Sequence, residues 1–288
     1  MTDLPNEAPV AVPEVLPILP LRDTVVLPFA VVPIAVGQPR SIRLVEDALR
    51  NGRLIGLVTM KDPRVEVPGP EDLYTIGTAS VIQQVLRSSD ATLRLVAQGL
   101  ERIRIVDFVG TDPYLVARVA AEPTPAETGL EIEALTHALR DLFRRLATLV
   151  EQIPDELADA AEQIKDPLQL AYLIAAAAPL TTPVRQEILE LNTISAKLHR
   201  LIELVQREVA VRELGQQIRA KTQEQLTRAQ RQYYLREQLR AIQRELGEIE
   251  PQEAEVADLR ERLEQANLPE EARREAEREL SRLEAVPL

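Results

Sequence analysis

Residues 122–127 read Glu-Pro-Thr-Pro-Ala-Glu, and the character of the sequence changes across this segment. Before it, short runs rich in Val and Ile are separated by Pro, Gly and Asp, which is typical of strands. After it, apolar residues recur at spacings of three and four, which is typical of helices. The sequence therefore predicts an α+β protein, with a β-rich head at residues 1–122, a linker at 123–128 and an all-α region beyond it.

Six or seven short strands and one helix are expected in the head. In the helix, which spans 39–50, Ile42, Val45 and Leu49 have helical spacing, and Asn51-Gly52 ends it. The first two strands carry prolines, which suits edge positions or bulges. This number of short strands favours a small barrel or two packed sheets. The expected strands span 15–19, 31–36, 54–58, 76–86, 92–97, 103–109 and 115–119, with a hairpin turn at 88–90.

Prolines divide the region after the linker into helices that form an all-α bundle at residues 129–193. From Ser195 onward no proline occurs before Pro251, so a long helix is expected at residues 194–250. At 1.5 Å per residue this helix is roughly 80 Å long, more than one small domain can cover, and we expect it to project. The expected bundle helices span 130–152, 154–164, 167–178 and 183–191.

The far end of the long helix carries the pattern of a coiled coil. Its apolar residues alternate spacings of four and three, which is the signature of a seam between helices. Tyr233 and Tyr234 precede this seam, and we expect them to pack at its hinge. Helices in residues 251–288 have the same spacing and are expected to fold back as an antiparallel coiled coil. The seam residues are Leu235, Leu239, Ile242 and Leu246.

The composition excludes several kinds of site. The chain of 288 residues has a net charge of −12 and 3% aromatic residues, so nucleic acid is an unlikely partner. The absence of cysteine excludes disulfides and Cys-ligated zinc. His137 and His199 are the only histidines, and no glycine is followed by lysine, so no metal site, Ser-His-Asp arrangement or Walker A loop is expected. Without a signal peptide or an apolar run of ~20 residues, the chain is expected to be cytoplasmic, with no membrane partner.

Two stretches carry a resemblance to a known family. They are Leu-Pro-Ile-Leu-Pro-Leu-Arg-Asp-Thr-Val-Val-Leu-Pro at residues 16–28 and Tyr-Tyr-Leu-Arg-Glu-Gln-Leu-Arg-Ala-Ile-Gln-Arg-Glu-Leu-Gly-Glu at residues 233–248. In this order and at this separation they resemble the N-terminal region of the Lon family of ATP-dependent proteases. Shorter stretches at 166–175, 186–190 and 267–272 agree, so that the resemblance covers the chain from about residue 16 to its end.

The resemblance implies a fold and a role. It implies a PUA-like β-barrel head, a helical bundle and a long coiled-coil helix that leads into an ATPase module, which uses ATP and Mg, and then into a serine protease with a Ser-Lys dyad. The family forms hexamers that unfold and degrade misfolded or damaged proteins. This chain ends at Leu288, where the family continues into the ATPase module. We therefore expect a non-catalytic fragment without a cofactor, which recognises substrates and organises the hexamer.

Exposed apolar residues are the candidates for contact with unfolded polypeptides. Val25, Val26, Leu27 and Phe29 follow a Pro-rich strand, where a loop could expose them, although filling the barrel core is the favoured interpretation, since Val and Leu are so often buried. Leu226 is the one large apolar residue of a polar helical stretch at 219–232. It is either a scattered surface residue or, in a ring of six helices, a contact for an extended chain.

Two other functions stay open on the sequence alone. The chain could be a stand-alone adaptor or a holdase-like chaperone for unfolded proteins. It could also be an RNA-binding PUA-like protein, although its acidic balance and few aromatic residues count against this.

Overall fold

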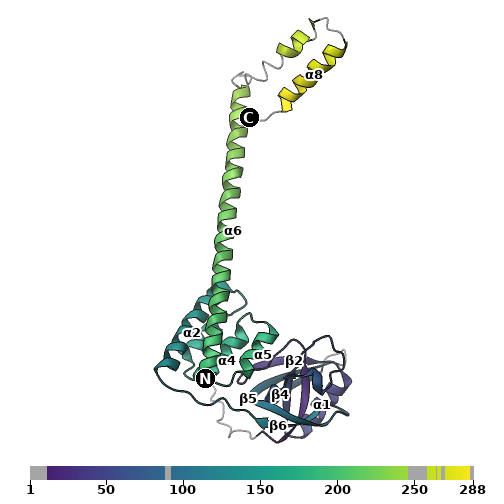
Figure 1. Cartoon of the computed structure of the whole chain (residues 1–288), viewed down its shortest axis with the longest axis vertical. Coiled ribbons are helices and arrows are strands. Elements are labelled where there is room, and N and C mark those ends of the chain that lie inside the picture. The colour runs from purple at the N-terminus through teal and green to yellow at the C-terminus, as the bar shows by residue number, and fades with distance from the viewer. Residues whose placement is uncertain (1–11, 88–91, 246–257, 264, 267–269, 286–288) are drawn as a thin grey trace. The chain divides into compact units, whose positions relative to one another are not determined.

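The computed structural model describes residues 12–87, 92–245, 258–263, 265–266 and 270–285 (Figure 1). The chain divides into two compact units, residues 1–214 and 215–288. The first unit holds a six-stranded sheet and several helices, as the predicted α+β class requires. The predicted turn at 88–90 and the seam residue Leu246 lie outside the described residues.

The strands of the head pair into a sheet that closes on itself. Neighbours in the order β2-β5-β4-β3-β1-β6 are paired, and β5 also pairs with β6, so the circuit from β5 through β4, β3, β1 and β6 returns to β5. This closure fits the predicted small barrel. β2 is attached to β5 alone, as an edge strand. The elements are β1 (Val15–Leu21), β2 (Val31–Val36), α1 (Pro39–Arg50), β3 (Leu54–Thr59), the short 3-10 helix η1 (Pro70–Asp72), β4 (Ile76–Arg87), β5 (Leu93–Gly110) and β6 (Val116–Ala121).

β5 corrects the prediction of two separate strands at 92–97 and 103–109. It is one strand of 18 residues, and its pairing with β4 continues through Gly99, Glu101 and Arg102, between the two predicted strands. Its first part pairs with β2 and its second part with β6. Because β5 contributes to both sides of the closed sheet, its apolar pattern changes along its length and resembles that of two strands.

Prolines lie in the first turn of α4 and α5, as expected from their fixed φ and missing N–H. Pro167 opens α4, where the Asp166 side chain accepts a hydrogen bond from Leu168 N, and Pro183 lies in the first turn of α5. The helices are α2 (Leu130–Leu149), α3 (Asp155–Gln163), α4 (Pro167–Ala177), α5 (Thr182–Glu190), α6 (Ile194–Glu245) and α8 (Glu270–Ala285), with a further helical segment at 258–263.

The head and the bundle share one core. Val25, Leu27 and Ile76 of the head belong to the same buried cluster as Phe143 and Leu170 of the bundle. The head and the bundle therefore contact each other through buried apolar side chains, which exclude water from the boundary between them. Residues 123–128 thus connect two parts of one compact unit, which contains residues 1–214.

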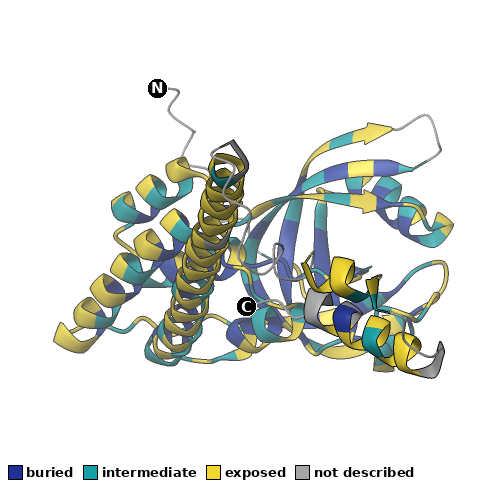
Figure 2. Ribbon diagram, turned by 90° about the horizontal axis from the view of Figure 1, so that it is seen from above, coloured by how far each residue is buried: buried dark blue, intermediate teal, exposed yellow. Residues whose placement is uncertain are grey.

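α6 changes from buried to exposed along its length (Figure 2). In its first turns Leu198, Leu201 and Val205 are completely buried. From Val211 onward its described apolar side chains are exposed, including the seam residues Leu235, Leu239 and Ile242 and the hinge residues Tyr233 and Tyr234. A seam is buried where a second helix faces it, and the antiparallel coiled coil with the helices of residues 251–288 stays a prediction.

Candidate polypeptide-binding groove

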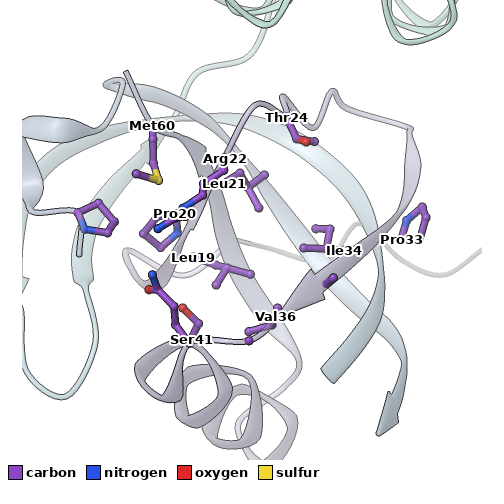
Figure 3. A pocket seen from close by; sticks show the side chains of 14 residues that line it. Leu19, Pro20, Leu21, Arg22, Thr24, Pro33, Ile34, Val36, Ser41 and Met60 are labelled. Atoms are coloured by element: carbon purple, nitrogen blue, oxygen red, sulfur yellow. The ribbon is translucent and has the colours of Figure 1, made fainter. Parts of the chain in front are cut away.

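A groove of about 380 Å³ lies between β1 and β2, which do not pair with each other (Figure 3). Leu19 and Leu21 on β1 face Ile34 and Val36 on β2 across it. Arg22 is the one charged residue among the described residues that line it. The groove is therefore lined mainly by uncharged residues, and it presents polar as well as apolar surface. It is completed by Pro20, Thr24, Pro33, Ala35, Gly37, Gln38, Ser41, Met60 and Pro68.

The floor of the groove is the core of the barrel. Leu19, Leu21 and Val36 are buried in one cluster with Val26 and with Val45 of α1. Close packing fixes the side chains of such a cluster in position. Ile34, by contrast, is only partly buried, and Pro33 and Ala35 are exposed. The groove thus presents a rigid apolar floor with a few accessible apolar groups above it.

The prolines explain why the strands leave this gap. Pro20 lies opposite Val58 in the β1–β3 pair, and Pro33 lies opposite Val96 in the β2–β5 pair. A proline has no N–H, so it is tolerated in a strand where the missing donor would point away from the partner strand. Pro33 was recognised in the sequence as a sign of an edge strand or a bulge, whereas Pro20 lies beyond the strand predicted at 15–19, whose own proline is Pro17. Ile34 and its neighbours were nevertheless missed as site residues, because the sequence does not show that β1 and β2 border one groove.

Three of the predicted contact residues are core residues. Val25, Val26 and Leu27 are buried, as the favoured interpretation predicted, and a loop does not expose them. Val26 packs under the groove, whereas Val25 and Leu27 pack against the helical bundle. Phe29 is on the surface, with 47% of its area exposed.

Phe29 closes the segment that follows β1. Its backbone has a φ of 67°, in the left-handed region, and its N–H donates to the carbonyl of Gly99 at 2.9 Å. Its ring centroid lies 6.3 Å from that of Tyr172 in α4. Phe29 therefore contacts the bundle, and the structure does not bring it into the groove, since it is not among the lining residues.

Leu226 and the predicted hinge and seam residues belong to the second compact unit. Leu226 is 54% exposed on α6, in a stretch whose described neighbours are also exposed. An isolated apolar side chain of this kind forms no pocket by itself. The second unit therefore contributes an exposed helix surface.

Two buried cations bind the C-terminus of α5. Arg102 of β5 donates to the carbonyls of Leu189 at 2.9 Å and Leu191 at 2.7 Å, and Lys197 of α6 donates to Ile188 O at 2.6 Å. The last carbonyls of a helix lack intrahelical partners and carry partial negative charge, so both cations are well placed. This arrangement joins the head, α5 and α6.

Burial has a strong effect on Lys197. Desolvation, followed by repulsion from Arg102, lowers the pKa of its ammonium group to about 7. Its Nζ atom also lies 5.0 Å from the centroid of the Tyr172 ring, which contributes an attraction between cation and aromatic face. Burial likewise raises the pKa of the Tyr172 hydroxyl.

The described residues offer no cluster of three or more His, Cys, Asp or Glu side chains that could hold a metal ion. Over the same parts of the chain, no helix combines the length and the apolar character needed to cross a membrane.

Comparison with known proteins gives consistent matches. A family model described as the ATP-dependent protease La (LON) substrate-binding domain matches residues 15–207. The chain is 45% identical over 276 residues to a Lon protease from Dictyoglomus thermophilum, covering 96% of the chain and 35% of that relative. It is 40% identical over 285 residues to Lon protease 1 of Herpetosiphon aurantiacus, covering 98% of the chain and 35% of that relative. The chain thus spans about a third of the length of the curated relatives it matches.

A solved structure matches the fold as well. It is the N-terminal domain of a Mycobacterium avium complex Lon protease, with a TM-score of 0.55 and 28% sequence identity. The match covers 67% of this chain and 98% of that structure.

Proposed function

The chain belongs to the Lon protease family, with a match to its substrate-binding domain, and from this premise we propose that it captures apolar segments of unfolded proteins in the groove between β1 and β2. Folded proteins hide such segments, whereas misfolded or damaged proteins expose them. A receptor for them needs apolar surface that stays accessible to a chain. The observation that carries the proposal is this groove, which opens apolar side-chain surface, together with polar groups, to solvent beside an edge strand.

The energy of such capture comes from a few side chains. Transfer of one Leu, Ile or Phe side chain from water into an apolar site contributes about 1.5–3 kcal/mol. A groove of about 380 Å³ has room for a few such side chains. Binding to one chain is therefore weak, and several copies acting together would hold a long substrate more tightly through a raised effective concentration.

A titration tests the proposal. The chain is titrated against one labelled polypeptide, prepared both in folded form and in permanently unfolded form. We expect binding of the unfolded form, and we expect Ile34→Ser to weaken it roughly tenfold, as the loss of about 1.4 kcal/mol requires. Val109→Ser is the matched control, because Val109 is an exposed β5 residue outside the groove lining.

Equal binding of the folded and unfolded forms, or equal effects of Ile34→Ser and Val109→Ser, would contradict the proposal. Thermal unfolding of both variants is measured beside the titration, since Ile34 also packs against the barrel core.

We also propose that the whole protein is a cytoplasmic, ATP-dependent serine protease of the Lon type. ATP, Mg and a Ser-Lys dyad would then belong to the two-thirds of the relatives' length that this chain does not span. In a hexamer of such a protein, the exposed Leu226 would provide a second contact for a threaded substrate. The relationship to proteins named Lon protease supports this proposal.

A further inference from the structure

The groove is a gap in the sheet that is bordered by two strand edges. β2 pairs with β5 along Val31–Val36 and lies at the end of the strand order. β1 pairs with β6 only as far as Pro17, and along Leu19–Leu21 its one partner among the described strands is β3. On the sides that face the groove, both strands therefore present backbone groups without a strand partner. Such edges are templates for another extended chain.

The two prolines determine which hydrogen bonds an added chain must supply. The backbone nitrogen atoms of Pro20 and Pro33, which carry no hydrogen, point away from their paired strands and toward the groove. Their carbonyls face the same way, because the N–H and C=O of one strand residue point to the same side. Ala35 lies two residues beyond Pro33, so its N–H and C=O also face the groove. Acceptors therefore outnumber donors at these positions, and an added chain binds mainly through its own N–H groups.

A positive charge lies beside the groove. A second hollow shares Arg22 and Gln38 with the groove and is also lined by Arg40 and Glu66. Within the described residues, one guanidinium nitrogen of Arg40 is buried without a hydrogen-bond partner. Arg22 donates to the backbone carbonyls of Val65 and Glu66. Two arginines and one glutamate thus line this hollow, and their net positive charge complements a segment that carries an acidic residue next to its apolar part.

We propose that a substrate segment binds by adding an extended strand to the free edge of β2, with alternate apolar side chains in the groove and a neighbouring carboxylate at Arg40. This inference rests on the proposed function and names the substrate class: extended, alternating apolar segments with an acidic flank. Segments with a proline at a pairing position are excluded, because they lack the N–H groups that the edge requires.

Backbone-modified peptides test the strand addition. The probe is a short labelled peptide of alternating Val and Ser residues followed by Asp. Two further versions carry N-methyl groups on alternate residues, one version for each set, so that the side chains stay the same and the donors are lost. We expect at least one of these versions to bind the 288-residue chain roughly tenfold or more weakly, since each lost hydrogen bond contributes about 1 kcal/mol.

A pair of variants tests the acidic flank. Arg40→Gln is expected to weaken the Asp-flanked peptide severalfold and to leave a Gln-flanked peptide unchanged. Arg43→Gln makes the same charge change on the same helix, outside the groove and the hollow beside it, and is expected to affect neither peptide.

The outcomes separate this inference from the proposed function. If the unmodified peptide and its two N-methylated versions bind equally, and Ile34→Ser weakens the binding of each, capture is purely apolar. The strand addition is then overturned while the proposed function stands. If unfolded polypeptide binds but the unmodified peptide does not, the groove is not an edge for strand addition and the inference fails alone. If neither the polypeptide nor the peptides bind, the proposed function fails as well.

Discussion

Lys197 gives the fold an unusual dependence on pH. Its pKa is lowered from 10.5 to about 7 in the folded state, by burial and then by Arg102. Below pH 7 both the folded and the unfolded state hold the proton. Between pH 7 and 10.5 only the unfolded state holds it, so the stability of the fold rises with pH in this window.

We expect Lys197→Met to remove this dependence. For the unmodified chain, the free energy of unfolding should rise between pH 7 and 9 with a slope of up to about 1.4 kcal/mol per pH unit. In the variant the slope should be close to zero, whatever the change in absolute stability, since the lost contacts to Ile188 O and Leu189 O do not titrate. Denaturant unfolding at several pH values measures both slopes. Parallel curves for the two proteins would contradict a lowered pKa at Lys197.

Gly99 is required by a close approach of two backbone segments. Its N–H donates to Ala30 O at 2.9 Å, and a Cβ atom at this position would collide with the carbonyl oxygen of Leu27. We expect Gly99→Ala to lower the free energy of unfolding by about 1–3 kcal/mol, because the backbone must shift. Gly110→Ala is the control in the same strand, since a Cβ there meets nothing within 4 Å. Equal free energies of unfolding for the two variants, measured by denaturant unfolding, would contradict this explanation.

At the level of helices and strands, the sequence predicts the bounds of an element well where several local signals agree. The helix predicted at 39–50 is found with these bounds as α1, because apolar spacing, Pro39 and Asn51-Gly52 all agree. Val25, Val26 and Leu27 show the opposite case. Successive side chains of an extended segment point to opposite sides, so Val26 enters the barrel core while its neighbours enter the bundle. A run of three apolar residues cannot reveal in advance that two cores meet around it.

The candidate groove could be predicted only in part. Pro33 marks β2 as an edge strand, and this is a local property of the sequence, whereas Pro20 lies beyond the strand predicted at 15–19 and β1 is paired on both sides over part of its length. That the two edges border one recess depends on the strand order, which is set by long-range pairing. Ile34 therefore looks like any other strand residue until β1 and β2 are placed on either side of the gap.

The two parts of α6 should respond differently to the same substitution. Leu201 is completely buried in the bundle, and we expect Leu201→Ala to cost about 2–5 kcal/mol of stability. Leu239 is 58% exposed, and Leu239→Ala should change the stability by less than about 0.5 kcal/mol. Denaturant unfolding at low protein concentration measures both. A large loss from Leu239→Ala that grows with protein concentration would instead show that the seam is paired between copies.

In the molecule as a whole, the core that the head and the bundle share couples the unfolding of one part to that of the other. Val25 and Leu27 of the head are buried with bundle residues, and Arg102 of β5 binds the carbonyls at the end of α5. Neither part can unfold without exposing the apolar surface of the other. A Pro-rich linker by itself would have predicted two independent domains.

We therefore expect the head and the bundle to unfold in one transition. The chain contains no Trp, so Phe108→Trp in the head and Leu142→Trp in the bundle each introduce a single fluorescent reporter at a partly buried position. The two reporters should give the same unfolding midpoint, because coincident probes are the sign of a single cooperative unit. Adding Arg102→Met should lower both midpoints together, since a lost buried donor leaves carbonyls unpaired at a cost of about 1–3 kcal/mol. Separate midpoints in the parent, or a shift of only one in the variant, would mean that the linker divides two domains after all.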